Sequence, residues 1–356
     1  MQEIIEGIRP LDREAMRAAE ERQGTLVKPA GSLGRLEELS IQMAGITGRV
    51  KNRIRRKVHF LLGADNGIYE EGVAAAPQEF TNLLMGFYAS DVRCAINVLC
   101  RRAGVDLKVV DMGVKGEVNG PNVLRVKLME GTGNFLRDRA MPVDIARRAV
   151  EVGMELARTA HEEGYDIIGT GEVGMANTTT AAACIIAALG RQSGMEPLVG
   201  RGAGLTDEAF THKQEVIAQA LRRLQPRQDD AFDILSKVGG LDIAGMCGLF
   251  LGAAYHRLPI VVDGVVSIAA ALLAWRINPL VRDYLIPSHQ SEEPAYRAAA
   301  EAMGLDPILN LRMRLGEGTG CPIAMQVLED ALEVFNDMNT FAETQLQTDY
   351  QEGIKA

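Results

Sequence analysis

The residue best suited to chemistry is a glutamate set between glycines near the C-terminus. The run Arg314-Leu315-Gly316-Glu317-Gly318-Thr319-Gly320 follows a short apolar stretch. Glycines on both sides let the backbone take positive φ values and approach a ligand closely. A carboxylate in such a turn packs poorly in a core but is well placed to take a proton from a bound molecule. The alternative is an ordinary glycine-rich turn with a solvated glutamate.

A second glutamate stands in a strand-to-helix turn. The run Gly171-Glu172-Val173-Gly174-Met175-Ala176-Asn177-Thr178 follows a β-branched stretch and precedes an apolar helical pattern. Free backbone N–H groups at the start of a helix favour a phosphate. The alternative is simple capping of that helix by Asn177 or Thr178. Because a carboxylate repels phosphate, Glu172 suits a developing positive charge, such as an oxocarbenium-like ribose carbon.

The same segment contains a weak dinucleotide-binding pattern, G-x-G-x-x-G, formed by Gly169, Gly171 and Gly174. That pattern requires an acidic residue about 20 positions later, at the end of a second strand. Glu196 is near that spacing but lies in a turn-like sequence before Pro197. A nicotinamide-dependent oxidoreductase is therefore a disfavoured alternative.

Two basic residues are candidates to neutralise a phosphate. Arg201 and Gly202 lie in a second glycine-rich loop, and Lys213 falls two turns into the helix that follows. Surface solvation is the alternative, and it is favoured more for Arg201 than for Lys213. The histidines lack metal-ligand spacing and the five cysteines lack C-x-x-C spacing. We therefore expect no metal and no redox cofactor.

The composition is typical of a soluble globular protein. Apolar residues make up 47% and charged residues 24% of the 356 residues, which allows a large core. The net charge of −9 argues against nucleic-acid binding. No apolar run reaches the roughly 18 residues that a membrane helix needs, and the N-terminus lacks a signal-peptide pattern. We expect a cytoplasmic protein.

Short β-branched runs alternate with helical patterns along the chain. This order predicts a Rossmann-like α/β fold, with a mostly parallel sheet covered by helices on both faces. The predicted strands are 58–63, 107–112, 165–169, 259–262, 284–286 and 309–313. The predicted helices are 12–23, 33–49, 78–102, 143–163, 178–189, 207–224, 243–255, 265–274, 293–303 and 322–341. Loops after parallel strands meet in one crevice, so Glu172 and Glu317 are expected to be neighbours.

Several motifs together resemble one family. Residues 28–37, 171–179, 238–244, 263–264 and 313–320 are similar to segments of nicotinate-nucleotide–dimethylbenzimidazole phosphoribosyltransferase. Proteins of this family have a large Rossmann-like domain and a small helical domain built from both chain ends, usually in a dimer. The resemblance implies a large catalytic domain over 57–320, with 1–56 and 321–356 together forming the small helical domain.

The resemblance also implies a reaction. The family moves phosphoribose from nicotinate mononucleotide to an acceptor base with inversion from β to α, releasing nicotinate and making the lower-ligand nucleotide of cobamides. By position, Glu317 matches the general base and Glu172 matches a second glutamate at the ribose. The implied phosphate- and ribose-binding residues are Gly174, Met175, Ala176, Asn177, Thr178, Gly202, Lys213 and Ser291.

One departure from the family pattern concerns the acceptor. Where the family usually has Thr-Ala-Gln-Met, this chain has Thr81-Asn82-Leu83-Leu84, so Leu83 replaces a hydrogen-bonding glutamine. Losing the partner of a buried ring nitrogen costs about 1–3 kcal/mol. We therefore hypothesise that phenol or p-cresol is the acceptor, with a benzimidazole as the other candidate. The predicted acceptor pocket comprises Leu83, Ala75, Phe80, Phe87, Met313 and Leu315.

The similarity to phenol-activating variants bears on the partner chain. Such enzymes resemble two related subunits, so the expected assembly is either a homodimer or a heterodimer with a paralogue. Because Glu172 and Glu317 are both present, we expect the catalytic subunit. The alternative is a non-catalytic paralogue subunit that keeps the fold without the activity.

Overall fold

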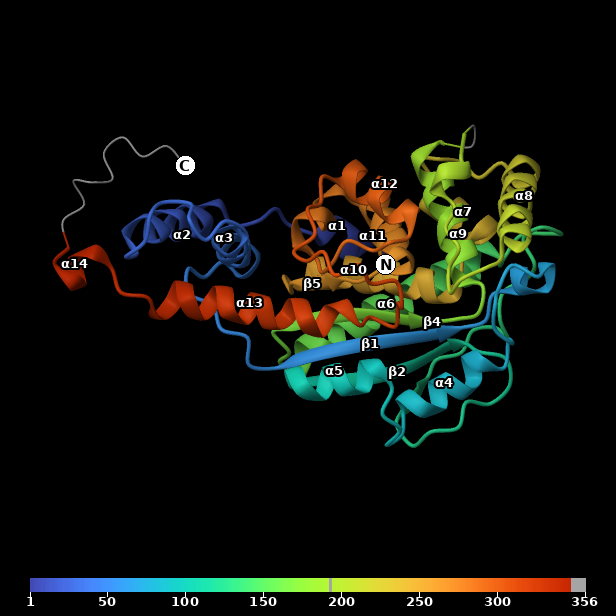
Figure 1. Cartoon of the computed structure of the whole chain (residues 1–356), viewed down its shortest axis with the longest axis horizontal. Coiled ribbons are helices and arrows are strands. Elements are labelled where there is room, and N and C mark those ends of the chain that lie inside the picture. Colours follow the sequence, from blue (N-terminus) through green and yellow to red (C-terminus); the bar gives the residue numbers. More distant parts are fainter. Residues whose placement is uncertain (192–193, 347–356) are drawn as a thin grey trace.

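A six-stranded parallel sheet forms the centre of the molecule in the computed structural model, which describes residues 1–191 and 194–346 (Figure 1). The strand order is β3-β2-β1-β4-β5-β6, and every neighbouring pair is parallel. The strands are β1 (Lys57–Ala64), β2 (Val105–Gly113), β3 (Val123–Arg125), β4 (Ile167–Val173), β5 (Ile260–Val262) and β6 (Leu285–Pro287). The order reverses between β1 and β4, which is where open parallel sheets bind ligands.

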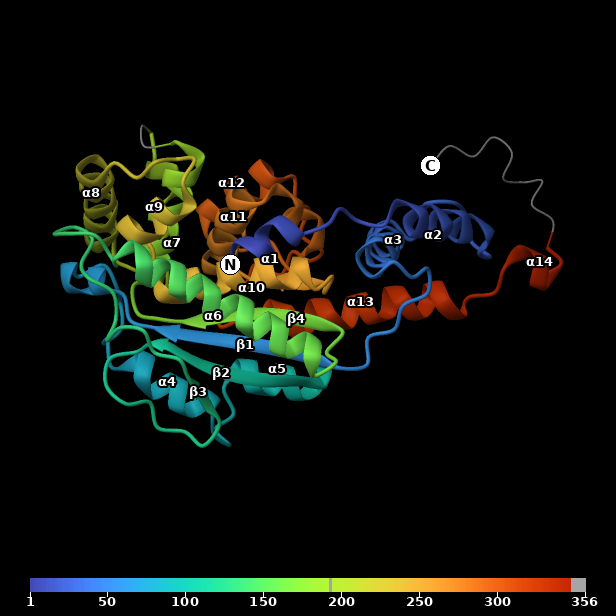
Figure 2. The same ribbon diagram turned by 180° about the vertical axis from the view of Figure 1, so that it is seen from behind.

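Helices cover both faces of the sheet because side chains along a strand alternate between its faces. Val58, Phe60 and Leu62 of β1 belong to a large core that also contains α6, α7, α10 and α11. Leu61 belongs to a second core with α5 and α13. Figure 2 shows α6 and α10 lying across the face opposite α5. The predicted Rossmann-like α/β fold is confirmed.

The helices have the following bounds. Those of the first half are α1 (Gln2–Gly7), α2 (Arg13–Thr25), α3 (Arg35–Thr47), α4 (Phe80–Tyr88), α5 (Ala95–Ala103), α6 (Val143–Glu162) and α7 (Asn177–Leu189). Those of the second half are α8 (Asp207–Leu224), α9 (Ala231–Val238), α10 (Leu241–Tyr255), α11 (Val265–Ile277), α12 (Pro294–Met303), α13 (Gly320–Asp337) and α14 (Phe341–Thr344). Within the described residues, none of these helices combines the length and apolarity needed to cross a membrane.

Both ends of the chain contribute to a smaller group of helices. Figures 1 and 2 show α13 running out from the sheet, with α2 and α3 beside its far half. Ala15, Ala19 and Phe335 are buried together in a separate core at this place. The first helix behaves differently, because α1 packs on α10 and the backbone oxygen of Ile5 accepts a hydrogen bond from Asn278 Nδ2 at 2.8 Å. The boundaries of the two predicted domains stay a prediction.

The predicted strand over 309–313 is wrong. This segment makes one isolated parallel bridge, between His289 and Leu309, and has no continuous ladder. Arg312 has a φ of +53°, which an extended strand cannot accommodate. The strand that the sequence analysis missed is β3, because its three residues are too few to give a sequence pattern.

The single helix predicted over 78–102 is also wrong. It is two helices, α4 and α5, separated by residues 89–94. Ser90 Oγ donates to the Phe87 backbone oxygen at 3.0 Å and accepts from the Val92 N–H at 3.3 Å. Such local side-chain bonds compete with the helical backbone pattern and end α4 there.

Candidate active site

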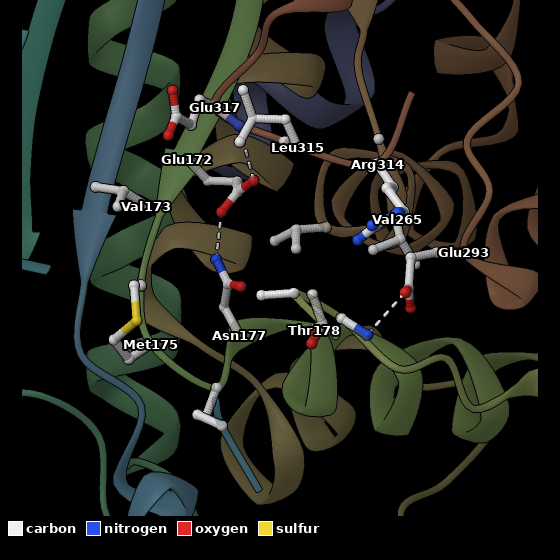
Figure 3. A pocket seen from close by; sticks show the side chains of 18 of the residues that line it. Glu172, Val173, Met175, Asn177, Thr178, Val265, Glu293, Arg314, Leu315 and Glu317 are labelled. Carbon is white, nitrogen blue, oxygen red and sulfur yellow. Dashed lines mark hydrogen bonds between the residues drawn. The ribbon is translucent and has the colours of Figure 1, made fainter. Parts of the chain in front are cut away.

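A cavity of about 630 Å³ opens beside the carboxyl end of β4 (Figure 3). Its volume is in the range of small-molecule binding pockets. Five backbone segments form most of the wall, namely 73–76, 172–178, 201–203, 264–266 and 314–317. Phe80, Leu84, Leu205, His289, Ser291 and Glu293 complete it. The loops expected to meet at one edge of the sheet therefore do so.

Glu172 and Glu317 are neighbours in this cavity, as the sequence predicted. Glu172 is a buried residue near the end of β4. Its Oε1 accepts a hydrogen bond from the Glu317 N–H at 3.3 Å, and its Oε2 accepts one from Asn177 Nδ2. Burial, followed by repulsion from the Asp242 carboxylate, raises the pKa of Glu172 to about 8.

The turn that carries Glu317 depends on its glycines. Gly316, Glu317 and Gly318 have φ values of +84°, +60° and +79°. A Cβ on Gly316 would lie 2.6 Å from Glu172 Oε1, and one on Gly318 would lie 2.1 Å from His59 Cε1. Both positions therefore exclude a side chain, and the backbone of the turn packs closely against the second glutamate and a buried histidine.

Asp263, in the loop after β5, holds the other side of the turn. Its carboxylate accepts hydrogen bonds from the N–H groups of Gly318 at 3.1 Å and Gly320 at 2.8 Å. Burial raises the pKa of Glu317, and the nearby Tyr88 hydroxyl opposes part of this shift. That hydroxyl is buried and makes no hydrogen bond within 3.5 Å to the described residues. A carboxylate with a raised pKa is better matched to proton transfer near neutral pH.

The turn after Glu172 leads directly into α7. Ala176, with a φ of +70°, precedes the helix, and no side chain caps it. The Asn177 amide donates to Glu172, so capping by Asn177 or Thr178 is not what the structure shows. The Met175 N–H donates to Thr81 Oγ1 at 3.0 Å, which ties the turn to α4. The N-terminus of α7 is thus held in the cavity wall.

A buried cation adjoins this turn. Lys213 of α8 is fully buried, and its Nζ donates to Thr178 Oγ1 at 3.1 Å. Burial lowers the pKa of Lys213 to about 8, and the Glu293 carboxylate opposes that shift. A Cβ on Gly202 would lie 2.8 Å from Thr178 Oγ1 and 3.8 Å from Lys213 Nζ. We call Thr178, Gly202 and Lys213 the lysine cluster.

The predicted acceptor pocket is brought together only in part. Three of its residues line the cavity, namely Ala75, Phe80 and Leu315. Three do not line it, namely Leu83, Phe87 and Met313. Leu83 is 48% exposed, and the next residue on α4, Leu84, forms the wall instead. The α4 residues that line the cavity, Phe80 and Leu84, are nevertheless both apolar.

Some cavity residues escaped the sequence reasoning, including Glu293, Arg314 and Leu84. The sequence offered one indication for Glu293, because it lies two residues after Ser291, a predicted site residue, and just before Pro294. Ser291 itself is buried in the wall, and its Oγ accepts from the Glu293 N–H at 3.3 Å.

Comparison with known proteins assigns the family. A family model described as phosphoribosyltransferase matches residues 8–346. A Clostridium tetani protein named nicotinate-nucleotide–dimethylbenzimidazole phosphoribosyltransferase is 45% identical over 346 residues, covering 97% of this chain and 95% of that protein. This chain belongs to the nicotinate-nucleotide–dimethylbenzimidazole phosphoribosyltransferase family.

Other members of the family agree in sequence and in fold. A Chloroflexus aurantiacus protein with the same name is 44% identical over 345 residues, covering 96% of this chain and 97% of that protein. The crystal structure of the Thermus thermophilus member matches with a TM-score of 0.88 at 37% identity, covering 95% of this chain and 99% of that one. Membership confirms the resemblance drawn from the motifs, and the chain is a pentosyltransferase.

Proposed function

We propose that this phosphoribosyltransferase moves phosphoribose from nicotinate mononucleotide to an aromatic acceptor and releases nicotinate. The product would be an α-riboside phosphate that becomes the lower-ligand nucleotide of a cobamide. The observation that carries the proposal is that the cavity containing the Glu172–Glu317 contact is also lined by Thr178 and Gly202, with the Lys213 ammonium buried behind them and bonded to Thr178. Carboxylates suit proton transfer and a cationic ribose carbon, whereas a buried ammonium and a helix N-terminus suit a phosphate.

The phosphate of nicotinate mononucleotide is assigned to the lysine cluster and the N-terminus of α7. Lys213 would supply a charge-assisted hydrogen bond, and residues 174–178 would supply backbone N–H groups. The ribose would then lie toward Glu172. Positive charge developing at the anomeric carbon would favour the ionised form of that carboxyl group, whose pKa is raised by burial.

Glu317 is assigned the role of general base. The acceptor oxygen or nitrogen would attack the anomeric carbon on the face opposite nicotinate, which inverts the centre as the nicotinate bond breaks. Glu317 would take the acceptor proton in the same step. A phenol, with a pKa of ~10, depends strongly on such a base, so the raised pKa of Glu317 supports this role.

The acceptor side supports a ring with few hydrogen-bonding atoms. Leu84, Phe80 and Leu315 give this part of the cavity an apolar wall. Phenol or p-cresol fits such a wall, and dimethylbenzimidazole, for which the relatives are named, is the other candidate. We propose that the chain is the catalytic subunit of either a homodimer or a heterodimer with a paralogue.

The test is nicotinate release from nicotinate mononucleotide by the purified chain, with phenol, p-cresol or dimethylbenzimidazole as the acceptor. Faster release with a phenol supports the full proposal. Release with dimethylbenzimidazole alone keeps the reaction and rejects the phenolic acceptor. If no acceptor supports release, with or without a candidate paralogue, the proposed reaction is wrong.

A further inference from the structure

Glu293 is a buried carboxylate in the cavity wall to which the proposed reaction gives no role. It directly precedes α12, but its side chain makes no hydrogen bond to the first turn of that helix. Instead its Oε1 accepts a hydrogen bond from the Gly202 N–H at 2.8 Å, and Figure 3 shows the carboxylate turned toward the segment beside Thr178.

The loop around this carboxylate is shaped to receive it. A Cβ on Gly200 would lie 1.9 Å from Glu293 Oε2, so only glycine leaves room for the carboxylate at that position. Gly202 has a φ of +56°, which turns its N–H toward Glu293. The Glu293 N–H is in turn held by Ser291 Oγ. Glu293 is therefore held both at its carboxylate and at its backbone N–H.

The charge of Glu293 acts on the lysine cluster. Its carboxylate favours the protonated form of Lys213, which burial alone would disfavour. One oxygen of this carboxylate also accepts the hydrogen bond of the Gly202 N–H. That donor belongs to the lysine cluster, to which we assign the substrate phosphate. A carboxylate and a phosphate in one partly buried site repel each other, because the site screens charge less than water does.

We propose that Glu293 is a positioning residue that competes with the substrate phosphate for the lysine cluster. It holds the Gly202 loop and the Lys213 ammonium ready for an anion, and the incoming phosphate displaces it from the Gly202 N–H. The return of the carboxylate then helps to release the phosphorylated product. This inference rests on the proposed phosphate site.

The variant Glu293→Gln tests it, because glutamine keeps the size and an acceptor oxygen but removes the charge. Glu292→Gln is the matched control, since its neighbouring carboxylate is exposed. Calorimetric titration at pH 7 with inorganic phosphate and with nicotinate mononucleotide should show about tenfold tighter binding to Glu293→Gln. Binding to Glu292→Gln should stay within about twofold of the unmodified chain, since exposed charges are screened. In turnover, KM for nicotinate mononucleotide and kcat should both fall in Glu293→Gln, because the product leaves more slowly.

The outcomes separate this inference from the proposed function. If the unmodified chain binds nicotinate mononucleotide and Glu293→Gln binds it no more tightly, the inference is overturned and the phosphate site survives. If neither protein binds nicotinate mononucleotide, both are overturned. Should Glu293→Gln fail to fold, Glu293→Met removes the charge and the acceptor at similar length, and the same tightening is expected.

Discussion

The two sides of the cavity are built in different ways. On the proposed phosphate side, Lys213 is fully buried, donates to Thr178 Oγ1 and is favoured in its protonated form by the charge of Glu293. On the acceptor side, Phe80 and Leu315 are 44% and 58% exposed and offer apolar surface. A buried charge needs its partners, so removing one is costly. Apolar surface depends mainly on area and shape, so residues there can change at lower cost.

If the proposed assignment of the two sides is correct, this difference would let one fold keep its donor while its acceptor changes. Hydrogen bonds from fixed groups define the phosphate side, and few substitutions preserve them. On the proposed acceptor side, the cavity wall is formed by the apolar side chains of Phe80, Leu84 and Leu315, whose contacts depend on shape rather than on hydrogen bonds. Glu317 stands between the two sides, because its N–H contacts Glu172 while its side chain belongs to the acceptor chemistry.

The largest expected effect is at the point where the two sides meet. Glu317→Gln should lower kcat by about 10²–10⁴, because the acceptor proton loses its base. Binding of nicotinate mononucleotide, measured by calorimetry, should change little, which would separate the base from the phosphate side. Unchanged nicotinate release would show that Glu317 is not the base.

A second substitution tests the phosphate side alone. Lys213→Met should raise KM for nicotinate mononucleotide by about 10–100-fold, the value of a charged hydrogen bond of ~1.5–3 kcal/mol. Methionine has a similar length and removes the buried ammonium, but it leaves the Glu293 carboxylate without that charge, so a thermal melt is needed to check that the variant is folded. The KM for the acceptor serves as the control. If both KM values rise equally, the two sides are not independent.

The acceptor side is tested by two neighbouring leucines. Leu84→Gln adds a hydrogen-bonding group to the cavity wall and should shift the ratio of kcat/KM toward dimethylbenzimidazole over phenol by about tenfold. Leu83→Gln is the matched control, because Leu83 is exposed and does not line the cavity. Steady-state kinetics with each acceptor measures both variants. A larger shift in Leu83→Gln would show that Leu83, as the sequence predicted, is the residue that contacts the acceptor.

The smallest effect concerns stability. Burial raises the pKa of Glu172 from 4.5 to about 8 and that of Asp242 from 3.8 to about 7. At these two groups the folded state therefore binds more protons than the unfolded state, so their contribution to stability is fully present below about pH 4 and is lost as the pH rises toward 8. Glu172→Gln should make the melting temperature less dependent on pH between 5 and 8, by a few degrees. Parallel pH curves for the variant and the unmodified chain would contradict this.

Much of the fold and of the glutamate pair could be predicted because the signals are local. Alternation of β-branched runs and helices defined the sheet, and parallel strands bring their carboxyl ends to one edge. That rule placed Glu172 correctly at the end of β4, but it placed Glu317, 145 positions away, through a strand over 309–313 that the structure does not have. Glu317 reaches this edge because the Gly318 and Gly320 N–H groups bond to Asp263 after β5. The strand expected over 309–313 failed because the positive φ of Arg312 has no sequence signature outside glycine.

The remaining features depend on contacts between distant segments. Leu83 was chosen because it stands at the place of a glutamine in the family motif, and that alignment does not say which face of α4 meets the cavity. The packing of α4 on the rest of the chain turns Leu84, rather than Leu83, into the wall. Glu293 was predicted only as the first residue of a helix over 293–303, because its actual partner, the Gly202 N–H, belongs to a loop 91 positions earlier. Neither could be deduced from local pattern.

His59, the buried histidine beneath the Glu317 turn, has a consequence for how this family can vary. Besides Gly318, a Cβ on Gly169 or Gly171 would come within 2.5 or 2.4 Å of its ring. Neither ring nitrogen makes a hydrogen bond within 3.5 Å to the described residues, so the ring acts there through its shape. At Gly171 and Gly318, backbone oxygens of Glu317 and Thr170 at 2.7 and 2.8 Å exclude a Cβ whatever residue stands at position 59. At Gly169 the near atoms belong to side chains alone, so a larger residue there requires a smaller one at position 59. A scan of single substitutions would therefore record Gly169 as intolerant although a paired change could be accepted.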